Sequence, residues 1–125
     1  MSVEQTQQVI RRYFEVMGAR GDFSKFYVEG VTWVMVDAGA EVRGRSAVRH
    51  YVTALHRQMS DVHTRSIVVS DGAAYLEGDC LNSQQTHAPR ISYCVAYDLT
   101  DDRITAMRCY GNFGAMTAQI EPADS

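Results

Sequence analysis

Four strand-like segments follow one another in the second half of the chain, with no helical pattern between them. Each is rich in β-branched and aromatic residues and is bounded by turn-forming residues such as Ser70-Asp71-Gly72. Consecutive strands joined by short turns pair antiparallel, so this half of the chain predicts a meander of long strands. The expected strands are Val62–Val69, Ala73–Leu81, Arg90–Leu99 and Ile104–Phe113.

The first half of the chain favours helices with one apolar face. Ser2 and Gln5 match the capping-box pattern of a helix start, and apolar residues then recur at helical spacing up to Gly18. Asp22 is a typical helix-capping residue, so a shorter second helix is expected after it, ending at Gly30. Two helices are therefore predicted before the first strand.

A strand and a third helix complete this half. The run Val31–Val36 predicts a strand that ends in a turn. Helices followed by consecutive strands predict an α+β fold, a cone-shaped barrel in which a strongly curved mixed or antiparallel sheet and three N-terminal-half helices enclose a pocket. The third helix should follow Gly44 and pack on the sheet through Val48, Tyr51, Val52, Leu55 and Met59.

Length and composition exclude several classes of protein. The 125 residues suit a single domain over residues 1–125, with a frayed tail at about 115–125. A net charge of -3 with a single lysine argues against a nucleic-acid partner. The chain has no membrane-spanning apolar stretch or signal-peptide pattern, so we expect a cytoplasmic protein without a membrane partner. Three cysteines without paired spacing predict no metal site.

Short stretches along nearly the whole chain occur in a characteristic order. They are Tyr13-Phe14 ahead of Gly21-Asp22, Val31–Met35, Gly44-Arg45-Ser46-Ala47-Val48, Ser70-Asp71-Gly72-Ala73-Ala74, and Asp102-Arg103-Ile104 with Arg108-Cys109-Tyr110. This order resembles the SnoaL-like and nuclear transport factor 2-like superfamily, which includes ketosteroid isomerases, limonene epoxide hydrolases, scytalone dehydratases and polyketide cyclases. The resemblance implies a pocket for a small hydrophobic ligand, no cofactor, and a homodimer formed through the outer face of the sheet.

The ligand-binding residues follow from this resemblance and from the register of the last hairpin. A left-handed residue at Asp102 predicts a turn that places Tyr93 beside Cys109 and Val95 beside Met107 on one face. That face corresponds to the pocket side of the relatives. The expected lining residues are Trp33, Met35, Leu55, Met59, Cys80, Ile91, Tyr93, Met107 and Cys109.

Three residues are candidates for acid–base chemistry. Tyr13 corresponds to the oxyanion-binding tyrosine of ketosteroid isomerases, although packing on the helix stripe also explains it. Asp37 lies on the inward face near the rim and would act as a base, or it belongs to the turn with Ala38-Gly39. His63 resembles a proton-moving histidine of scytalone dehydratases, or it lies on the outer face. His56, which flanks the buried helix stripe, is a weaker candidate.

The outer face of the sheet carries alternating charged residues. Glu77, Asp79, Arg108 and Tyr110 should project from it. Glu77 and Asp79 are expected to form cross-strand ion pairs with Arg65 and Arg108 in the dimer interface. Arg108 and Tyr110 are therefore interpreted as structural.

The catalytic sets of two relatives are incomplete in this chain. The base and acid positions of ketosteroid isomerases fall on Met35 and Ile91, and the charged positions of the epoxide hydrolases fall on Gly78, Cys80 and Cys109. Three functions remain open: an enzyme of the cyclase, isomerase or dehydratase type acting on a hydrophobic carbonyl-bearing metabolite by cofactor-free acid–base chemistry, a non-catalytic binding or accessory protein for a small hydrophobic ligand, and a dimeric association module.

Overall fold

The first helix begins where the sequence predicts. In the computed structural model, which describes residues 1–120, α1 (Val3–Gly18) follows Ser2. The Ser2 hydroxyl accepts a hydrogen bond from the Gln5 backbone N–H at 3.1 Å, and Gln5 Oε1 accepts one from the Ser2 N–H at 2.8 Å. This capping box satisfies two backbone groups that a helix leaves without partners. The buried face of α1 includes Ile10 and Tyr13.

The second predicted helix is shorter than expected, because a strand begins earlier. η1 (Phe23–Phe26) is a single turn of 3-10 helix, and β1 (Tyr27–Met35) follows it directly. Gly30 therefore lies inside a strand and does not end a helix. The pairing of Tyr27 with Ile104 on a distant strand, which local sequence cannot reveal, explains the early start.

A hairpin that the sequence analysis did not identify leads into the last long helix. β2 (Ala40–Arg43) pairs antiparallel with β1 after a turn at residues 36–39. α2 (Arg45–Gln58) follows Gly44, as predicted, and buries an apolar face. Met59, expected on this helix, is instead the first residue of the next strand.

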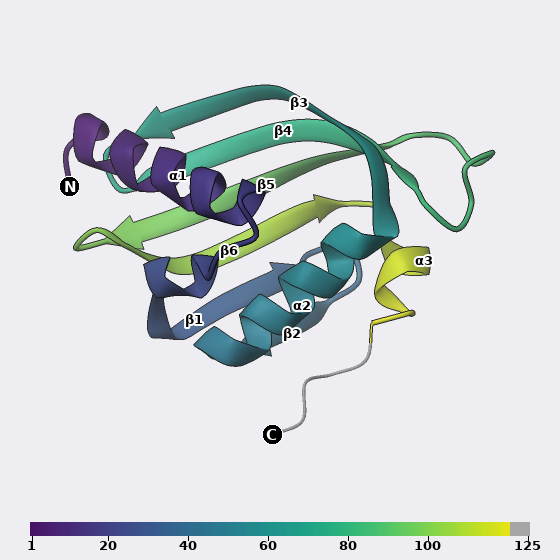
Figure 1. Cartoon of the computed structure of the whole chain (residues 1–125), viewed down its shortest axis with the longest axis horizontal. Helices are drawn as coiled ribbons and strands as arrows, with labels where there is room; N and C mark the ends of the chain where they lie inside the picture. The colour runs from purple at the N-terminus through teal and green to yellow at the C-terminus, as the bar shows by residue number, and fades with distance from the viewer. Residues whose placement is uncertain (121–125) are drawn as a thin grey trace.

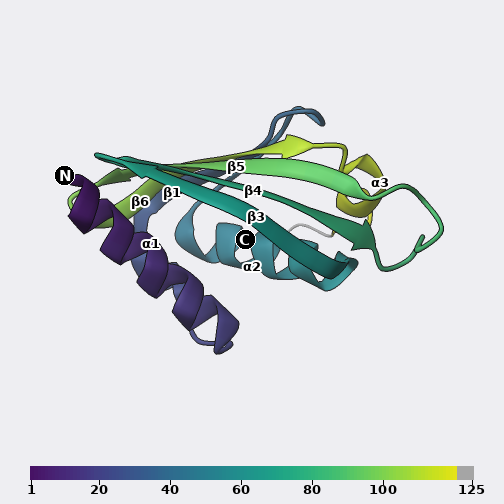
Figure 2. The same ribbon diagram turned by 90° about the horizontal axis from the view of Figure 1, so that it is seen from above.

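Residues 1–120 form a six-stranded curved sheet in the order β2-β1-β6-β5-β4-β3. The four long strands of the second half are β3 (Met59–Ser70), β4 (Ala73–Asn82), β5 (Ile91–Thr100) and β6 (Arg103–Gly111). They form the predicted meander, while β1 pairs parallel with β6, so the sheet is mixed and unclosed (Figure 1). Figure 2 shows α1 and α2 on the same face of the sheet. This arrangement confirms the α+β fold class.

The register of the last hairpin differs from the prediction by two residues. Asp101 and Asp102 both have positive φ, at 51° and 65°, and form a two-residue turn in place of the expected turn with one left-handed residue, which shifts the pairing by one residue. A β-bulge adds the second shift, because Leu99 pairs with Ile104 whereas Asp98 pairs with Ala106. Tyr93 therefore lies opposite Gly111 rather than Cys109. A shift by an even number of residues keeps each side chain on its face, so the inward-facing set is unchanged.

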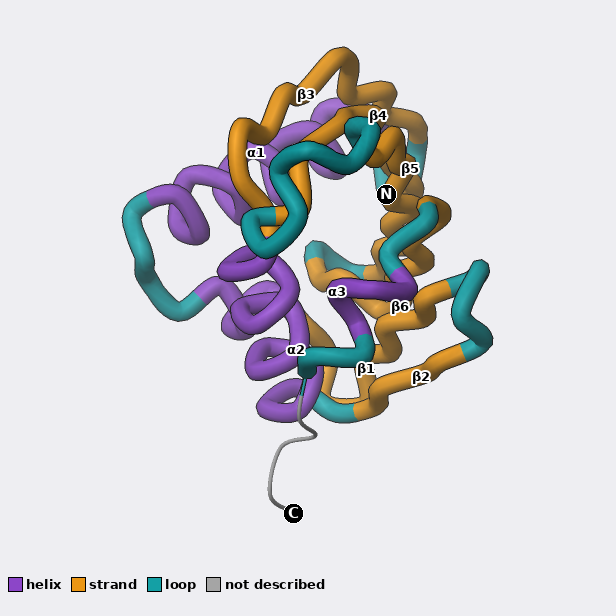
Figure 3. Tube along the Cα trace, turned by 90° about the vertical axis from the view of Figure 1, so that its right-hand side faces the viewer, coloured by secondary structure: helices purple, strands orange, loops and turns teal. Residues whose placement is uncertain are grey.

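A short helix lies near the end of the described residues, in the segment where fraying was expected. α3 (Gly114–Thr117) contacts α2 (Figure 3). Met116 of α3 is fully buried, which orders the first part of the segment predicted to be a frayed tail. The last part of that segment, residues 121–125, lies outside the described residues. Across the described chain, no helix combines the length and apolar character needed to cross a membrane.

Candidate functional site

A cavity of about 240 Å³ lies between the concave face of the sheet and helices α1 and α2. Hydrophobic and aromatic side chains make up most of its wall. Within residues 1–120, His56 and Thr64 are the only lining residues outside those two classes, and no Asp, Glu, Lys or Arg contributes to the wall. The cavity is therefore an apolar site with a few hydrogen-bonding groups.

Five of the nine predicted lining residues border this cavity: Trp33, Leu55, Met59, Tyr93 and Cys109. The indole of Trp33 is 4% exposed, and its Nε1–H donates to Sδ of Met35 at 3.0 Å. Trp33 therefore points inward, as its position on the strand predicts.

The other four predicted lining residues do not border the cavity. Met35, Met107 and Cys80 are buried in the core. The Met35 sulfur contacts the Trp33 indole, and the Met107 sulfur contacts the Tyr13 hydroxyl. Both sulfurs therefore face aromatic side chains of the wall and not the cavity itself. Ile91 is the first residue of β5 and borders a separate surface hollow near the loop after β4. The alternation of side chains along a strand therefore identifies inward-facing residues, but not which of them border the cavity.

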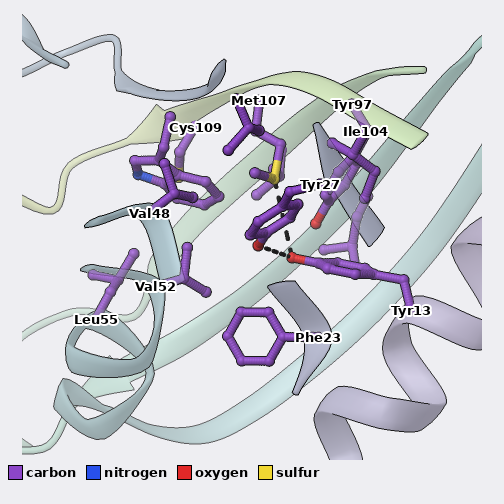
Figure 4. Close-up of a cluster of buried hydrophobic side chains, with 14 of the residues drawn as sticks. Tyr13, Phe23, Tyr27, Val48, Val52, Leu55, Tyr97, Ile104, Met107 and Cys109 are labelled. Atoms are coloured by element: carbon purple, nitrogen blue, oxygen red, sulfur yellow. Dashed lines mark hydrogen bonds between the residues drawn. The ribbon is translucent and has the colours of Figure 1, made fainter. Parts of the chain in front are cut away.

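Tyr13 lies at the cavity wall, but its hydroxyl is already engaged. The Tyr13 and Tyr27 hydroxyl oxygens are 2.7 Å apart, and Met107 Sδ lies 4.0 Å from the Tyr13 hydroxyl. Figure 4 shows the two hydroxyls pointing toward one another beside this sulfur. Burial raises the pKa of Tyr13 well above its usual value, so the phenol stays neutral. The oxyanion-binding role of Tyr13 remains a prediction.

Two tyrosines of β5 bring further hydroxyl groups to the wall. Tyr93 and Tyr97 line the cavity, and none of the described residues forms a hydrogen bond with either hydroxyl. Burial raises the pKa of Tyr93 to about 12 and that of Tyr97 well above its usual value. Both are therefore neutral donors. Tyr97 was missed by the sequence analysis, although it alternates with Tyr93 and Val95 on one face.

Gly78 on β4 makes room for one of these hydroxyls. A Cβ atom at this position would lie 2.6 Å from the His63 carbonyl oxygen and 3.0 Å from the Tyr93 hydroxyl oxygen. Any larger residue would displace the tyrosine or the neighbouring strand.

His56, a weaker candidate in the sequence, borders the cavity. It lies in the last turn of α2, four residues after Val52, and both side chains border the cavity. His56 is an exposed residue, and the protein atoms around its ring lower its pKa by desolvation. These observations agree, because a ring in an open cavity contacts both water and protein. No hydrogen bond from residues 1–120 reaches the ring.

The two other predicted acid–base residues lie outside the cavity. Val62 and Thr64 border it, so His63 projects from the opposite face of β3. There its ring lies 3.3 Å from Asp61 Oδ1 and 3.6 Å from an Asp79 carboxylate oxygen. The open alternative, an outer-face histidine, is therefore correct.

Asp37 is exposed in the turn after β1 and does not line the cavity. The prediction that Asp37 faces inward assumed that the strand continues past Met35, but β1 ends at Met35. The turn interpretation of Asp37 fits this position.

The buried thiols behave as small hydrophobic groups. Desolvation raises the pKa of Cys80, and it raises that of Cys109 to about 12, so neither forms a thiolate near neutral pH. All three cysteines are free. In the described part of the chain, no group of three or more His, Cys, Asp or Glu side chains is arranged to hold a metal ion.

The outer face carries an ion-pair network, part of which was predicted. Arg65 lies 2.9 Å from Asp79 Oδ2, and Arg90 lies 2.6 Å from Asp79 Oδ1. Hydrogen bonds from Arg90 and Arg65 lower the pKa of Asp79. Arg108 instead pairs with Asp98, at 2.7 Å, because these residues lie within one hairpin.

The curved mixed sheet, the helices on its concave face and the cavity between them form an α+β fold that known proteins share. The family model described as a SnoaL-like domain matches residues 10–107, more than half of the chain. The chain belongs to this SnoaL-like family. None of the curated proteins compared with it matches its sequence.

Solved structures share the whole architecture at low sequence identity. A de novo designed protein with a curved β-sheet is 17% identical with a TM-score of 0.75, covering 96% of this chain and 97% of that chain. A steroid delta-isomerase from Pseudomonas aeruginosa is 10% identical with a TM-score of 0.75, covering 91% and 84%. A nuclear transport factor 2-like protein from Burkholderia xenovorans LB400 is 16% identical with a TM-score of 0.73, covering 97% and 99%. These similarities establish the fold and not the activity.

Proposed function

We propose that this protein binds a small, largely apolar organic molecule in the cavity between the sheet and helices α1 and α2. The observation that carries the proposal is the composition of the wall, which is apolar and aromatic with a few hydrogen-bonding groups. Small-molecule sites typically have this composition. An apolar cavity of roughly 150 Å³ holds benzene. A cavity of about 240 Å³ therefore suits a molecule of one or two rings.

The polar groups of the wall select among such molecules. Tyr93 and Tyr97 present neutral hydroxyls without a partner from the described residues, and His56 presents an imidazole. A ligand that leaves these groups without hydrogen bonds would lose affinity, because desolvated polar groups are costly when unpaired. We therefore expect a ligand with a carbonyl or hydroxyl group attached to an apolar ring system.

The second candidate function is an enzyme of the isomerase, cyclase or dehydratase type that works without a cofactor. One structural neighbour is a steroid delta-isomerase, but its 10% identity supports only a shared fold. The observation that favours an enzyme is His56, a titratable group at the wall of an otherwise apolar cavity. The third candidate, a dimeric association module, does not need a ligand cavity, so the presence of the cavity gives it no support.

Binding is tested with 2-tetralone, a two-ring ketone, and with tetralin, its hydrocarbon counterpart. Trp33 is the only tryptophan, so its indole N–H gives one resonance that reports on the cavity. We expect saturable shifts of this resonance with both probes and tighter binding of the ketone, by about 1 kcal/mol per hydrogen bond formed. Val52→Phe, which narrows the cavity, should weaken both.

A control on the outer face, Tyr110→Phe, should leave binding unchanged. If neither probe shifts the Trp33 resonance at its solubility limit, the proposed binding function is wrong.

A further inference from the structure

The acid–base groups at the cavity wall come from four elements. Tyr13 belongs to α1, Tyr93 and Tyr97 to β5, Cys109 to β6 and His56 to α2. Burial keeps the phenols and the thiol neutral near pH 7. Among the described lining residues, His56 is thus the one group that can both accept and release a proton near neutral pH.

The surroundings of His56 favour the neutral form of its imidazole. Desolvation lowers its pKa, and no charged residue of the described chain lines the cavity to counter this. The C-terminal end of α2 favours the cation, but the net direction is downward. A neutral ring has a nitrogen lone pair available, and its exposed part allows proton exchange with water.

We infer that His56 is the proton-transfer residue of this cavity and acts on a ligand held between α2 and the tyrosines of β5. The inference rests on the proposed binding function. It replaces Asp37 and His63, which lie outside the cavity, and it uses a helix residue where the isomerase base and acid positions hold Met35 and Ile91.

The step can be written for a ketone with a hydrogen on the carbon beside its carbonyl. An imidazole nitrogen of His56 takes that hydrogen as a proton. The electron pair of the broken C–H bond forms the C=C bond of an enolate, and the carbonyl π electrons move to oxygen. The hydroxyl of Tyr93 or Tyr97 donates to this oxygen, and the imidazolium returns a proton to carbon after exchange with water.

The experiment measures deuterium uptake by 2-tetralone in D₂O, beside its carbonyl, by NMR. The wild type should accelerate uptake, and His56→Gln should slow the protein-dependent rate by about 10²-fold or more. The matched control is His63→Gln, which removes an outer-face histidine and should retain the wild-type rate. The rate should rise with pH through the lowered pKa of His56 and then level off, because the neutral ring is the active form.

Binding of 2-tetralone is followed in the same samples through the Trp33 indole resonance. Binding with uptake that is equal in the wild type and His56→Gln overturns the role of His56. Absence of binding to the wild type overturns the proposed function instead. If His56→Gln does not fold, the wild-type profile decides: a rate that is flat across the His56 pKa measured by NMR overturns the inference.

Discussion

Single residues in this protein take their chemical character from where the fold places them. His56 and His63 lie seven residues apart, yet one borders an apolar cavity and the other lies among outer-face carboxylates. Tyr13 shows the same dependence, because its hydroxyl faces Tyr27 at 2.7 Å inside the core. Residue type alone therefore does not separate a site residue from a structural one.

The effects of Tyr13 and Tyr27 on the free energy of unfolding should be coupled, because their hydroxyls interact. Tyr27→Phe leaves the Tyr13 hydroxyl buried with only the weak Met107 sulfur contact, so we expect it to lower the free energy of unfolding by about 1–3 kcal/mol. Replacing both tyrosines by Phe should cost less than the sum of the single changes. Urea denaturation measures all three variants, with exposed Tyr110→Phe as a near-neutral control. Strict additivity would show that the hydroxyls do not interact.

At the scale of elements, turns decide how the predicted strands are aligned. The β5–β6 turn uses two non-glycine residues in the left-handed region, Asp101 and Asp102. The β3–β4 turn uses Gly72, with φ 76°, whose added Cβ would lie 3.2 Å from the Leu99 carbonyl oxygen. The first turn therefore contains strain that glycine would relieve, and the second already has the residue it needs.

Substitutions in these two turns should have opposite signs. Asp101→Asn with Asp102→Gly matches the preferred sequence of a two-residue hairpin turn and should stabilise the fold by about 1 kcal/mol. Gly72→Ala should destabilise it by about 1 kcal/mol or more, because alanine is strained at positive φ. Thermal unfolding of both variants beside the wild type provides the measurement. Destabilisation by the Asn-Gly turn would contradict the assigned turn geometry.

At the scale of the whole molecule, the sheet has one covered and one open face. Helices α1 and α2 cover the concave face and enclose the cavity (Figure 2). The open face exposes large side chains, including Val68 at 59%, Tyr75 at 45% and Tyr110 at 44%. Apolar groups on an open sheet face, together with charged pairs beside them, are suited to association with a second copy.

We expect a homodimer that buries this open face. Tyr75→Glu places a charge at its apolar part and should weaken dimerisation by about tenfold or more, because a buried unpaired charge is costly and tyrosine is enriched among the residues that carry binding energy. Val3→Glu, at an exposed residue of α1, should leave dimerisation unchanged. Sedimentation equilibrium of the three proteins gives the dissociation constants. A wild type that is monomeric at tens of micromolar would refute the expectation.

Local sequence patterns predicted most of the helices and strands and the faces that they bury. The capping box at Ser2 predicted the start of α1, and apolar spacing predicted α2. The β-branched and aromatic runs predicted four of the strands to within about three residues at each end. Alternation also placed Trp33 and Tyr93 on the inward face, and an even register shift left that result intact. These features depend on backbone period and near neighbours, which a short stretch of sequence contains.

Which of the inward-facing residues reach the cavity depends on long-range packing. The early start of β1 depends on its pairing with β6. Met35 and Met107 lie behind the wall, where their sulfurs contact Trp33 and Tyr13. The same long-range packing turned His63 outward and brought His56 of α2 to the cavity wall. Strand pairing and side-chain contacts join residues far apart in the chain, so no local pattern in the sequence specifies them.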